Sequence, residues 1–233
     1  MFDHVTVRVA DLGASRRFYE LALGEPTHVS DYVEWDEFGL IADTTVTRNL
    51  HVGFRAASRG DVDAWWQRLT NADYESDGEP GPRPHYSEDY YGAFVRDPGG
   101  NSVEAVHKPS SSAGGRIDHL WLRARDVAAE RHFWETVAPV LGIRLKHDTP
   151  GWIQYVGGTA TFSYVEGVPT EHVHLAFPAS DNAAVAAFHE AAVGAGFTDN
   201  GPPGERPHYH PGYFGAFVLD PDGNNIEAVC HNR

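Results

Sequence analysis

The feature that most constrains this sequence is an internal repeat, because the segment at residues 78–106 recurs almost unchanged at residues 201–229. A constant shift of 123 residues relates three pairs of chemically distinctive residues: His51 and His174, His85 and His208, and Glu104 and Glu227. Upstream, His4 pairs with His119 at a shift of 115, so the second copy carries eight more residues there. The chain is therefore a tandem duplication, and one fold must serve both halves.

The repeat sets the expected domain boundaries. We predict one domain at residues 1–108 and a second at 117–233, joined by a linker at 109–116 that is rich in Ser and Gly. Each half has about 110 residues, which is enough to bury a core of its own. No apolar run approaches the roughly 18 residues that a membrane helix requires.

Each half shows the order strand, helix and three strands, written twice, which predicts an α+β fold of four βαβββ units. In the first unit, Val5, Val7 and Val9 alternate with polar residues, as is typical of a strand with one buried face. Residues 11–24 then show helical spacing, and short β-rich runs follow between residues 27 and 43.

The same order returns from residue 50 onward. We predict, in sequence, a strand at 50–55, a helix at 59–72, a loop rich in Pro and Gly at 78–84, and closing strands at 91–96 and 102–107. The turn residues at 97–101 suit a tight hairpin between those closing strands. The second half repeats the scheme, with its helices at 128–141 and 183–195.

Histidines on the opening strands and a glutamate on the last strand recur in both halves. If the helices cover the apolar faces of the strands, the opposite faces line a cup in which these side chains meet. We therefore expect two triads, one in each half: His4, His51 and Glu104, and His119, His174 and Glu227. Two imidazoles and one carboxylate form a facial triad with positions open for water, substrate or dioxygen. The predicted cofactor is a divalent metal ion, namely Fe(II), Mn, Zn, Ni or Co.

Each Pro/Gly-rich loop also carries a His-Tyr pair near the expected mouth of the cup. Histidine accepts a proton near neutral pH, and tyrosine can donate a hydrogen bond to a developing oxyanion. We therefore predict catalytic roles for His85, Tyr86, His208, Tyr209 and Tyr213. In the alternative interpretation, the Arg-Pro-His-Tyr sequence is a structural loop that packs on its neighbours.

Other residues are predicted to line the cups. Trp35, Trp121 and Tyr155 are candidates for aromatic walls. Arg8 and Arg123 share the ligand-bearing faces of their strands, where a guanidinium can pair with an anionic substrate or with a nearby carboxylate.

Composition excludes some partners. The formal net charge of −15 argues against a nucleic acid or an anionic membrane, because binding to phosphates needs clustered Lys and Arg. Cys230 is the only cysteine, which excludes an internal disulfide and suits the reducing cytoplasm. The first residues lack the order of a secretory signal. We expect a cytoplasmic monomer or homodimer with a small-molecule substrate.

Two motifs carry a family resemblance. They are the opening Asp3-His-Val-Thr-Val-Arg8 with Asp11-Leu-Gly-Ala-Ser-Arg-Arg-Phe-Tyr19, and the closing Asp220-Pro-Asp-Gly-Asn-Asn-Ile-Glu227. The sequence resembles the vicinal oxygen chelate superfamily, which includes glyoxalase I, the bleomycin-resistance proteins and the extradiol dioxygenases. The resemblance implies paired βαβββ units that close into an eight-stranded cup, around a divalent metal that chelates neighbouring oxygens of a substrate.

The resemblance also bears on the ligand set. Glyoxalase-type sites add a fourth ligand from the fourth strand, but here residues 39–43 and 161–166 offer no carboxylate at a clearly matched position. The three-ligand pattern is closer to extradiol dioxygenases, which use a histidine and a tyrosine to handle protons and bound oxygen. His85 and His208 suit the histidine role, whereas phenylalanines stand nearest the expected tyrosine: Phe94 and Phe217.

Together these features predict a metal-dependent dioxygenase, lyase or isomerase of the glyoxalase/extradiol dioxygenase type. It would act on a small molecule with adjacent oxygens, through a 2-His-1-Glu site in each half. One alternative is a protein of the bleomycin-resistance type that binds or sequesters a small molecule without catalysis. Another is a chain with one active and one vestigial half.

Overall fold

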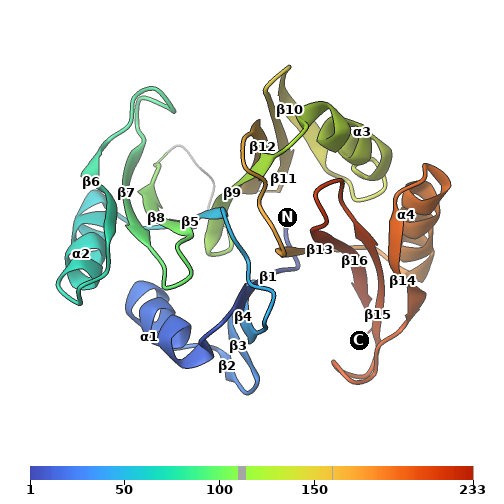
Figure 1. Ribbon diagram of the computed structural model, residues 1–233, viewed down its shortest axis with the longest axis horizontal. Helices are drawn as coiled ribbons and strands as arrows, with labels where there is room; N and C mark the ends of the chain where they lie inside the picture. Colours follow the sequence, from blue (N-terminus) through green and yellow to red (C-terminus); the bar gives the residue numbers. More distant parts are fainter. Residues whose placement is uncertain (110–113, 159, 233) are drawn as a thin grey trace.

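A computed structural model describes residues 1–109, 114–158 and 160–232 of the chain. The described residues form two eight-stranded sheets and four helices (Figure 1). The predicted α+β class, the four βαβββ units and the eight-stranded cups are confirmed. The predicted linker at 109–116 is only partly visible, because residues 110–113 lie outside the described residues.

The first half contains the first two units. Their elements are β1 (His4–Val9), α1 (Leu12–Leu23), β2 (His28–Val29), β3 (Tyr32–Trp35), β4 (Phe38–Ala42), β5 (His51–Arg55), α2 (Arg59–Thr70), β6 (Ser76–Pro82), β7 (Tyr91–Arg96) and β8 (Ser102–His107).

The second half repeats the order. Its elements are β9 (Ile117–Ala124), α3 (Val127–Val137), β10 (Arg144–Thr149), β11 (Trp152–Gly157), β12 (Ala160–Glu166), β13 (His174–Pro178), α4 (Asn182–Gly194), β14 (Thr198–Glu205), β15 (Tyr213–Leu219) and β16 (Asn225–His231).

The sheets pair units from different halves. One sheet joins the second and third units in the order β10-β11-β12-β9-β5-β8-β7-β6, and we call it the middle cup. The other joins the fourth and first units in the order β14-β15-β16-β13-β1-β4-β3-β2, and we call it the terminal cup. The expectation that the histidines and the glutamate of one half share a cup is therefore wrong.

The repeat itself explains this error. All four units offer a similar first-strand edge, so the residue pattern cannot distinguish pairing within a half from pairing between halves. The crossing connections show how the pairing is fixed. Residues 43–50 and 167–173 run against each other, and the backbones of Arg48 and Glu171 exchange two hydrogen bonds of 3.1 Å. Each connection carries the chain from one cup to the other.

The helices, in contrast, pack together within each half, α1 with α2 and α3 with α4. Each helix has a side-chain cap at its N-terminus, which is Ser58 for α2 and an aspartate for each of the other three. At the start of α1, for example, Asp11 accepts a hydrogen bond from the Ala14 N–H at 2.8 Å. The helices cover the outer sides of the sheets (Figure 1), and one continuous apolar core includes residues from both halves. The opposite, polar faces of the strands remain for the cups.

The segment predicted as a loop at 78–84 is also partly wrong, because β6 occupies residues 76–82. This strand lies at the sheet edge, and its pairing with β7 shifts register twice. Pro80 and Pro82 are tolerated there because an edge strand needs fewer backbone donors. The predicted hairpin at 97–101 is confirmed, with the Asp97 N–H donating to the Asn101 carbonyl at 3.0 Å.

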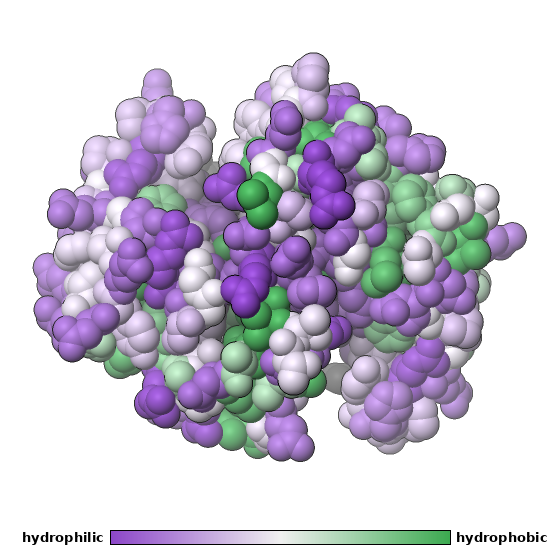
Figure 2. Space-filling model, viewed as in Figure 1, coloured by the Kyte–Doolittle hydropathy of each residue, from purple (hydrophilic) through white to green (hydrophobic). Residues whose placement is uncertain are grey.

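No helix among the described residues is long and apolar enough to cross a membrane. The surface in Figure 2 is mostly hydrophilic, with smaller apolar areas between. It is hollowed between the tip of the β6–β7 connection and the β10–β11 hairpin, over the middle cup.

One buried acid departs from an ordinary apolar core. Glu130 on α3 is fully buried, and neither carboxyl oxygen makes a hydrogen bond of normal geometry with the described residues. Burial, then the charges of Asp220 and Asp222, raise the pKa of Glu130 well above its usual range. The first half has Ser15 at the equivalent helix position, so the fold does not require an acid there.

We predict that Glu130→Gln stabilises the protein at pH 8 by about 2 kcal/mol, because folding no longer holds a buried carboxyl. The folded pKa of Glu130 is raised, so the unfolding free energy should fall as pH rises above about 4.3, the usual carboxyl pKa. Denaturant titrations at pH 5 and pH 8 should show a smaller loss in the variant. The exposed Glu135 on the same helix supplies the control Glu135→Gln. An unchanged pH dependence in Glu130→Gln would contradict the account.

Candidate metal centres between the halves

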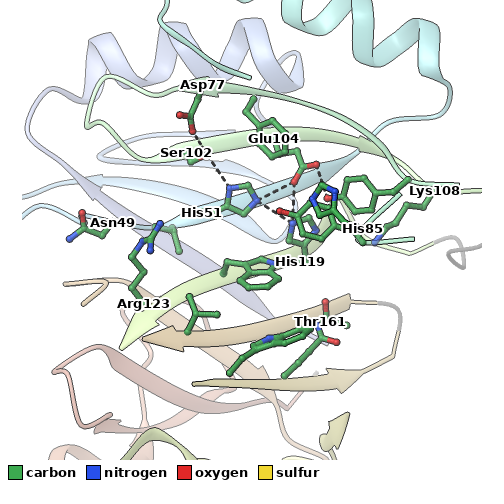
Figure 3. Close-up of a pocket in the computed structure, with 18 of the residues that line it drawn as sticks. Asn49, His51, Asp77, His85, Ser102, Glu104, Lys108, His119, Arg123 and Thr161 are labelled. Carbon is green, nitrogen blue, oxygen red and sulfur yellow. Dashed lines mark hydrogen bonds and ion pairs between the residues drawn. The ribbon is translucent and has the colours of Figure 1, made fainter. Parts of the chain in front are cut away.

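The middle cup gathers one triad from both halves (Figure 3). His51 begins β5, Glu104 lies on β8 and His119 lies on β9. The His51 Nε2 atom is 3.1 Å from Glu104 Oε2 and 3.2 Å from His119 Nε2, and His119 Nε2 is 3.2 Å from the same Oε2. Three donor atoms therefore converge on one point.

Strand register creates this convergence. β5 and β9 are antiparallel, with Gly53 opposite His119, while β5 and β8 are parallel, with Gly53 beside Glu104. A Cβ atom on Gly53 would lie 2.4 Å from the His119 ring, and one on Gly92 would lie 2.3 Å from Glu104 Oε1. These two glycines leave the space in which the ligands sit.

The remaining polar atoms of the triad are held by neighbours that fix the ring tautomers. Asp118 Oδ1 accepts from His119 Nδ1 at 2.9 Å. The Ser102 hydroxyl, which donates to Asp77 at 2.7 Å, lies 3.1 Å from His51 Nδ1 and can accept its proton. Each Nε2 atom thereby faces the centre, where a bound metal would take the place of its proton, in the pattern that supports metal-binding histidines.

Glu104 is oriented in the same way. The Tyr90 hydroxyl donates to Glu104 Oε1 at 2.6 Å, which leaves Oε2 for the centre. Burial alone would raise the pKa of Glu104, but hydrogen bonds from His119 and His51 lower it to about 2. Burial alone would lower the pKa of His119, but hydrogen bonds to Asp118 and Glu104 raise it to about 9. The carboxylate is thus ionised across the neutral range.

The terminal cup holds the second triad. His174 Nε2 is 3.0 Å from both Glu227 Oε2 and His4 Nε2, and His4 Nε2 is 3.7 Å from Glu227 Oε2. The Tyr213 hydroxyl donates to Glu227 Oε1 at 2.6 Å, and Asp3 Oδ1 lies 2.9 Å from His4 Nδ1. This centre repeats the ligand geometry of the middle cup.

Its supporting residues differ in charge. Where the middle cup has Asp77 and Ser102, the terminal cup has Asn200 and Asn225, and Asn225 Nδ2 lies 2.7 Å from His174 Nδ1. Burial, then the charge of Arg8, lower the pKa of His174 to about 4. Burial raises the pKa of Glu227 to about 7. A neutral support makes the imidazole less basic, so we expect the terminal centre to hold a cation more weakly.

Each donor set fits a divalent metal ion. All three ligand atoms of each group lie within 4.8 Å of one another, and the three residues are His4, His174 and Glu227 in one group and His51, Glu104 and His119 in the other. The fourth strands supply no further ligand. In the terminal cup, strand register places Gly39 of the first unit at the position that Glu227 occupies in the fourth unit. In the middle cup, it places Ser163 of the third unit at the position that Glu104 occupies in the second unit. Each candidate ligand set among the described residues therefore has three members, and a metal held there would keep its remaining positions open.

A cavity of about 820 Å³ opens above the middle triad. Its lining includes His85 and Tyr86 from the β6–β7 connection, whose rings lie 4.1 Å apart, and Trp121 from β9. Trp121 stacks on Trp152 at 5.5 Å and an interplanar angle of 20°. The predicted aromatic wall at Trp121 is confirmed.

The walls predicted at Trp35 and Tyr155 are wrong. Both side chains are buried on the helix side, where Trp35 lies 5.9 Å from the Tyr19 ring and Tyr155 stacks on Phe162 at 5.4 Å. Side chains alternate along a strand, so an odd number of residues changes the face. The aromatic residues that face the cups lie three positions earlier: Tyr32 and Trp152.

The predicted loop residues at the terminal cup mirror those of the middle cup. The rings of His208 and Tyr209 lie 4.3 Å apart, and Tyr209 is exposed. The geometry gives Tyr213 a contact that the sequence did not indicate, since its hydroxyl is bound to Glu227. Catalytic roles for His85, Tyr86, His208, Tyr209 and Tyr213 remain predictions.

Sequence reasoning missed the supporting carboxylates of Asp3 and Asp118. A signal was present, because the dipeptide Asp-His occurs at the start of both β1 and β9. Strand alternation argued against a contact between each aspartate and the histidine that follows it, since neighbouring side chains normally point to opposite faces. The β5–β9 register shifts between Gly53 and Phe54, next to this point, where the strand is irregular.

Comparisons with known proteins agree with this architecture. The family model described as "Glyoxalase/Bleomycin resistance protein/Dioxygenase superfamily" matches residues 1–105 and 116–228. Glyoxalase I from Zea mays is 19% identical, with 99% of this chain and 92% of that chain covered and a TM-score of 0.70. A putative dioxygenase from Bacillus subtilis is 13% identical, with 100% and 85% covered and a TM-score of 0.69. Both likenesses concern the fold. No curated protein matches the sequence.

We predict that the wild-type chain binds two metal ions and that ligand pairs from different halves share one ion. The double variant His51→Ala/His119→Ala should keep about one ion per chain, because both changes fall in the middle cup. His4→Ala/His51→Ala should keep none. Metal analysis of untagged protein after desalting reports the ratio. Loss of both ions in the first variant and of one in the second would indicate sites within single halves.

We also predict that Tyr90→Phe weakens metal binding in the middle cup by about 10- to 100-fold, because Glu104 loses the donor that orients it. Competition with a chelator measures this, in a His174→Ala background that leaves only the middle centre. Tyr91→Phe is the matched control, since the Tyr91 hydroxyl donates to Asp63 at 2.8 Å instead. Equal affinities of the two variants would contradict a role for the Tyr90 hydroxyl.

Proposed function

Because the chain belongs to the Glyoxalase/Bleomycin resistance protein/Dioxygenase superfamily, we propose that it is a metal-dependent enzyme acting on a small molecule with adjacent oxygen atoms. The observation that carries the proposal is the pair of converging triads, each with two imidazoles and one carboxylate. With Gly39 and Ser163 at the fourth-strand positions, neither site is closed by a fourth side chain. Such a centre keeps neighbouring positions for two substrate oxygens.

We assign turnover to the middle cup. Its triad lies under the cavity of about 820 Å³, a size typical of small-molecule sites. In the terminal cup, the Tyr32 hydroxyl lies where a Cβ atom of Gly39 would be, at 2.0 Å, and is 3.2 Å from the Thr6 hydroxyl. Tyr32 thus takes up space beside the terminal triad. This difference supports one working centre and one centre of lesser activity.

The metal, when bound, would act as a Lewis acid or oxygen-binding centre. The chain's own residues would do the rest. His85 lines the cavity on a loop that also carries Tyr86, so its imidazole is the proposed proton acceptor for a bound hydroxyl group. Tyr90 is less suited to that role, because its hydroxyl already donates to Glu104. Trp121 would exclude water from one side of the substrate.

We expect the enzyme to act as a monomer, because the ligands of both triads come from one chain. A homodimer is compatible with this but supplies nothing that the sites lack. The buried thiol of Cys230, the one cysteine, is free, which suits our proposal of a reducing cytoplasmic location.

The first test of the function is metal content followed by reaction type. Protein purified without a histidine tag should contain stoichiometric divalent metal or bind it on titration. After anaerobic loading with Fe(II), oxygen uptake with catechols would identify a dioxygenase. Isomerisation or cleavage of a substrate without oxygen uptake would identify a lyase or isomerase.

For either reaction we expect His85→Gln to reduce kcat by about 100-fold or more with little change in metal content, since a proton acceptor is worth about that much. His208→Gln, the equivalent change at the terminal cup, is the matched control and should retain most of the activity. Failure to bind any divalent metal would contradict the proposed function. Equal loss of activity in both variants would contradict the assignment of turnover to the middle cup.

A further inference from the structure

The internal repeat allows the two cups to be compared position by position. The third unit, in the middle cup, can be compared with the first unit, in the terminal cup, by aligning His119 with His4. The strand pairings then show that Trp121 corresponds to Thr6 and that Gln154 corresponds to Glu34. The same register makes Trp152 equivalent to Tyr32, and Gly167 equivalent to Asp43. The cup-facing surfaces have therefore diverged in charge and in aromatic area, although the triads are the same.

Because Gly167 replaces the aspartate found in the terminal cup, the equivalent arginine of the middle cup has no ion-pair partner at this position. In the terminal cup, Arg8 Nη1 donates to Asp43 Oδ2 at 2.9 Å, so that guanidinium is neutralised. Arg123 is the equivalent residue in the middle cup, and a Cβ atom on Gly167 would lie 3.3 Å from its Nη1. No acidic side chain among the described residues pairs with Arg123. Its guanidinium lines the cavity as an exposed cation (Figure 3).

A second cation, Lys146, lines the same cavity because of an irregularity in strand β10. Lys146 stands between Leu145 and His147, where the β10–β11 register shifts, so it is the extra residue of a bulge. Its side chain lines the same cavity and has no hydrogen bond or ion pair with the described part of the chain. Bulges commonly re-aim a side chain. Here the bulge adds a positive charge near the mouth of the middle cup.

The other charges of the cavity are already paired. Arg96 donates to Asp77 at 2.6 Å, and Lys108 donates to Asp118. Glu104 is a proposed metal ligand. Arg123 and Lys146 therefore give the cavity an uncompensated positive charge, in a chain whose formal net charge is −15. Unpaired cations in a pocket of an acidic protein favour an anionic ligand.

The wall between the triad and Arg123 is flat. On β9, the residue midway between His119 and Arg123 is Trp121, whose ring stacks on that of Trp152. Residues advance by about 3.3 Å along a strand, so the Cα atoms of His119 and Arg123 are about 13 Å apart. His119, Trp121 and Arg123 therefore follow one another along one face of β9. An aromatic body would pack well against this wall.

We propose that the middle cup selects an elongated planar anion. Its adjacent oxygens would lie at the triad, its aromatic body on Trp121, and its acidic group at Arg123, while Lys146 adds to the positive charge of the same cavity. This inference rests on the proposed function for the oxygen end and on the unpaired Arg123 guanidinium for the acidic end. The terminal cup, with Asp43 on its arginine and with Glu34 in place of Gln154, lacks this selectivity.

Caffeate and its methyl ester test the proposal, because both carry adjacent hydroxyl groups on a planar body and only caffeate has the distal carboxylate. Binding is measured anaerobically by calorimetry to Zn(II)-loaded protein, in the His174→Ala background that leaves only the middle centre. We expect caffeate to bind about tenfold or more tightly than the ester, which is the effect of one charge-assisted contact. Added salt should weaken caffeate binding only.

Two variants should remove the preference. Arg123→Gln deletes the cation, and Gly167→Asp recreates the ion pair of the terminal cup; each should lower caffeate affinity by about tenfold and leave ester binding unchanged. Unchanged ester binding also shows that the variants fold. Arg8→Gln is the matched control in the other cup and should change neither affinity.

The outcomes separate this inference from the proposed function. Equal binding of caffeate and ester in the parent protein, with no effect of Arg123→Gln, would overturn the anion selectivity and leave the metal-dependent chelation standing. Binding of neither compound to the Zn(II)-loaded protein would overturn both.

Discussion

Both candidate metal centres depend on the antiparallel pairing of opening strands from different halves. β5 pairs with β9 and β1 pairs with β13, so each cup receives one histidine from each half. The carboxylate comes from β8 or β16, the parallel partner of β5 or β13. On that strand it lies two residues beyond the position paired with the histidine. A small change in this register would turn a ligand to the opposite face. Sheet pairing, more than any local motif, therefore assembles the site, and neither half contains a complete cup.

Duplication has kept the triads while their surroundings diverged. In the middle cup, Asp118 and Asp77 support the histidines through charge, and two cations face an open cavity with an aromatic wall. In the terminal cup, amides replace part of that support, and Tyr32 lies close over Gly39. The same ligand set thus sits in two electrostatic environments. Under the proposed function, this divergence would allow one copy to specialise for a substrate while the other retains the geometry of a metal site.

Much of this could be predicted from the sequence, because hydrophobic alternation and the repeat identify four βαβββ units and all six candidate ligands. Counting residues along the fourth strands also shows that Gly39 and Ser163 stand at the positions where a fourth ligand would be expected. The combination of ligands could not be predicted, since the repeated strand edges are interchangeable until the connections are known. Trp35 was assigned to the wrong face because one residue of register decides the face of a short strand. The contact between Asp118 and His119 depends on local geometry at an irregular strand pair, which alternation does not describe.

The most direct measurement of the central claim is anomalous diffraction from crystals of the protein loaded with Zn(II), recorded at the zinc edge. We predict two peaks, one bounded by His51, Glu104 and His119 and the other bounded by His4, His174 and Glu227. Each peak would then have ligands from both halves. A peak enclosed by His4, His51 and Glu104, or metal density away from both triads, would contradict the account.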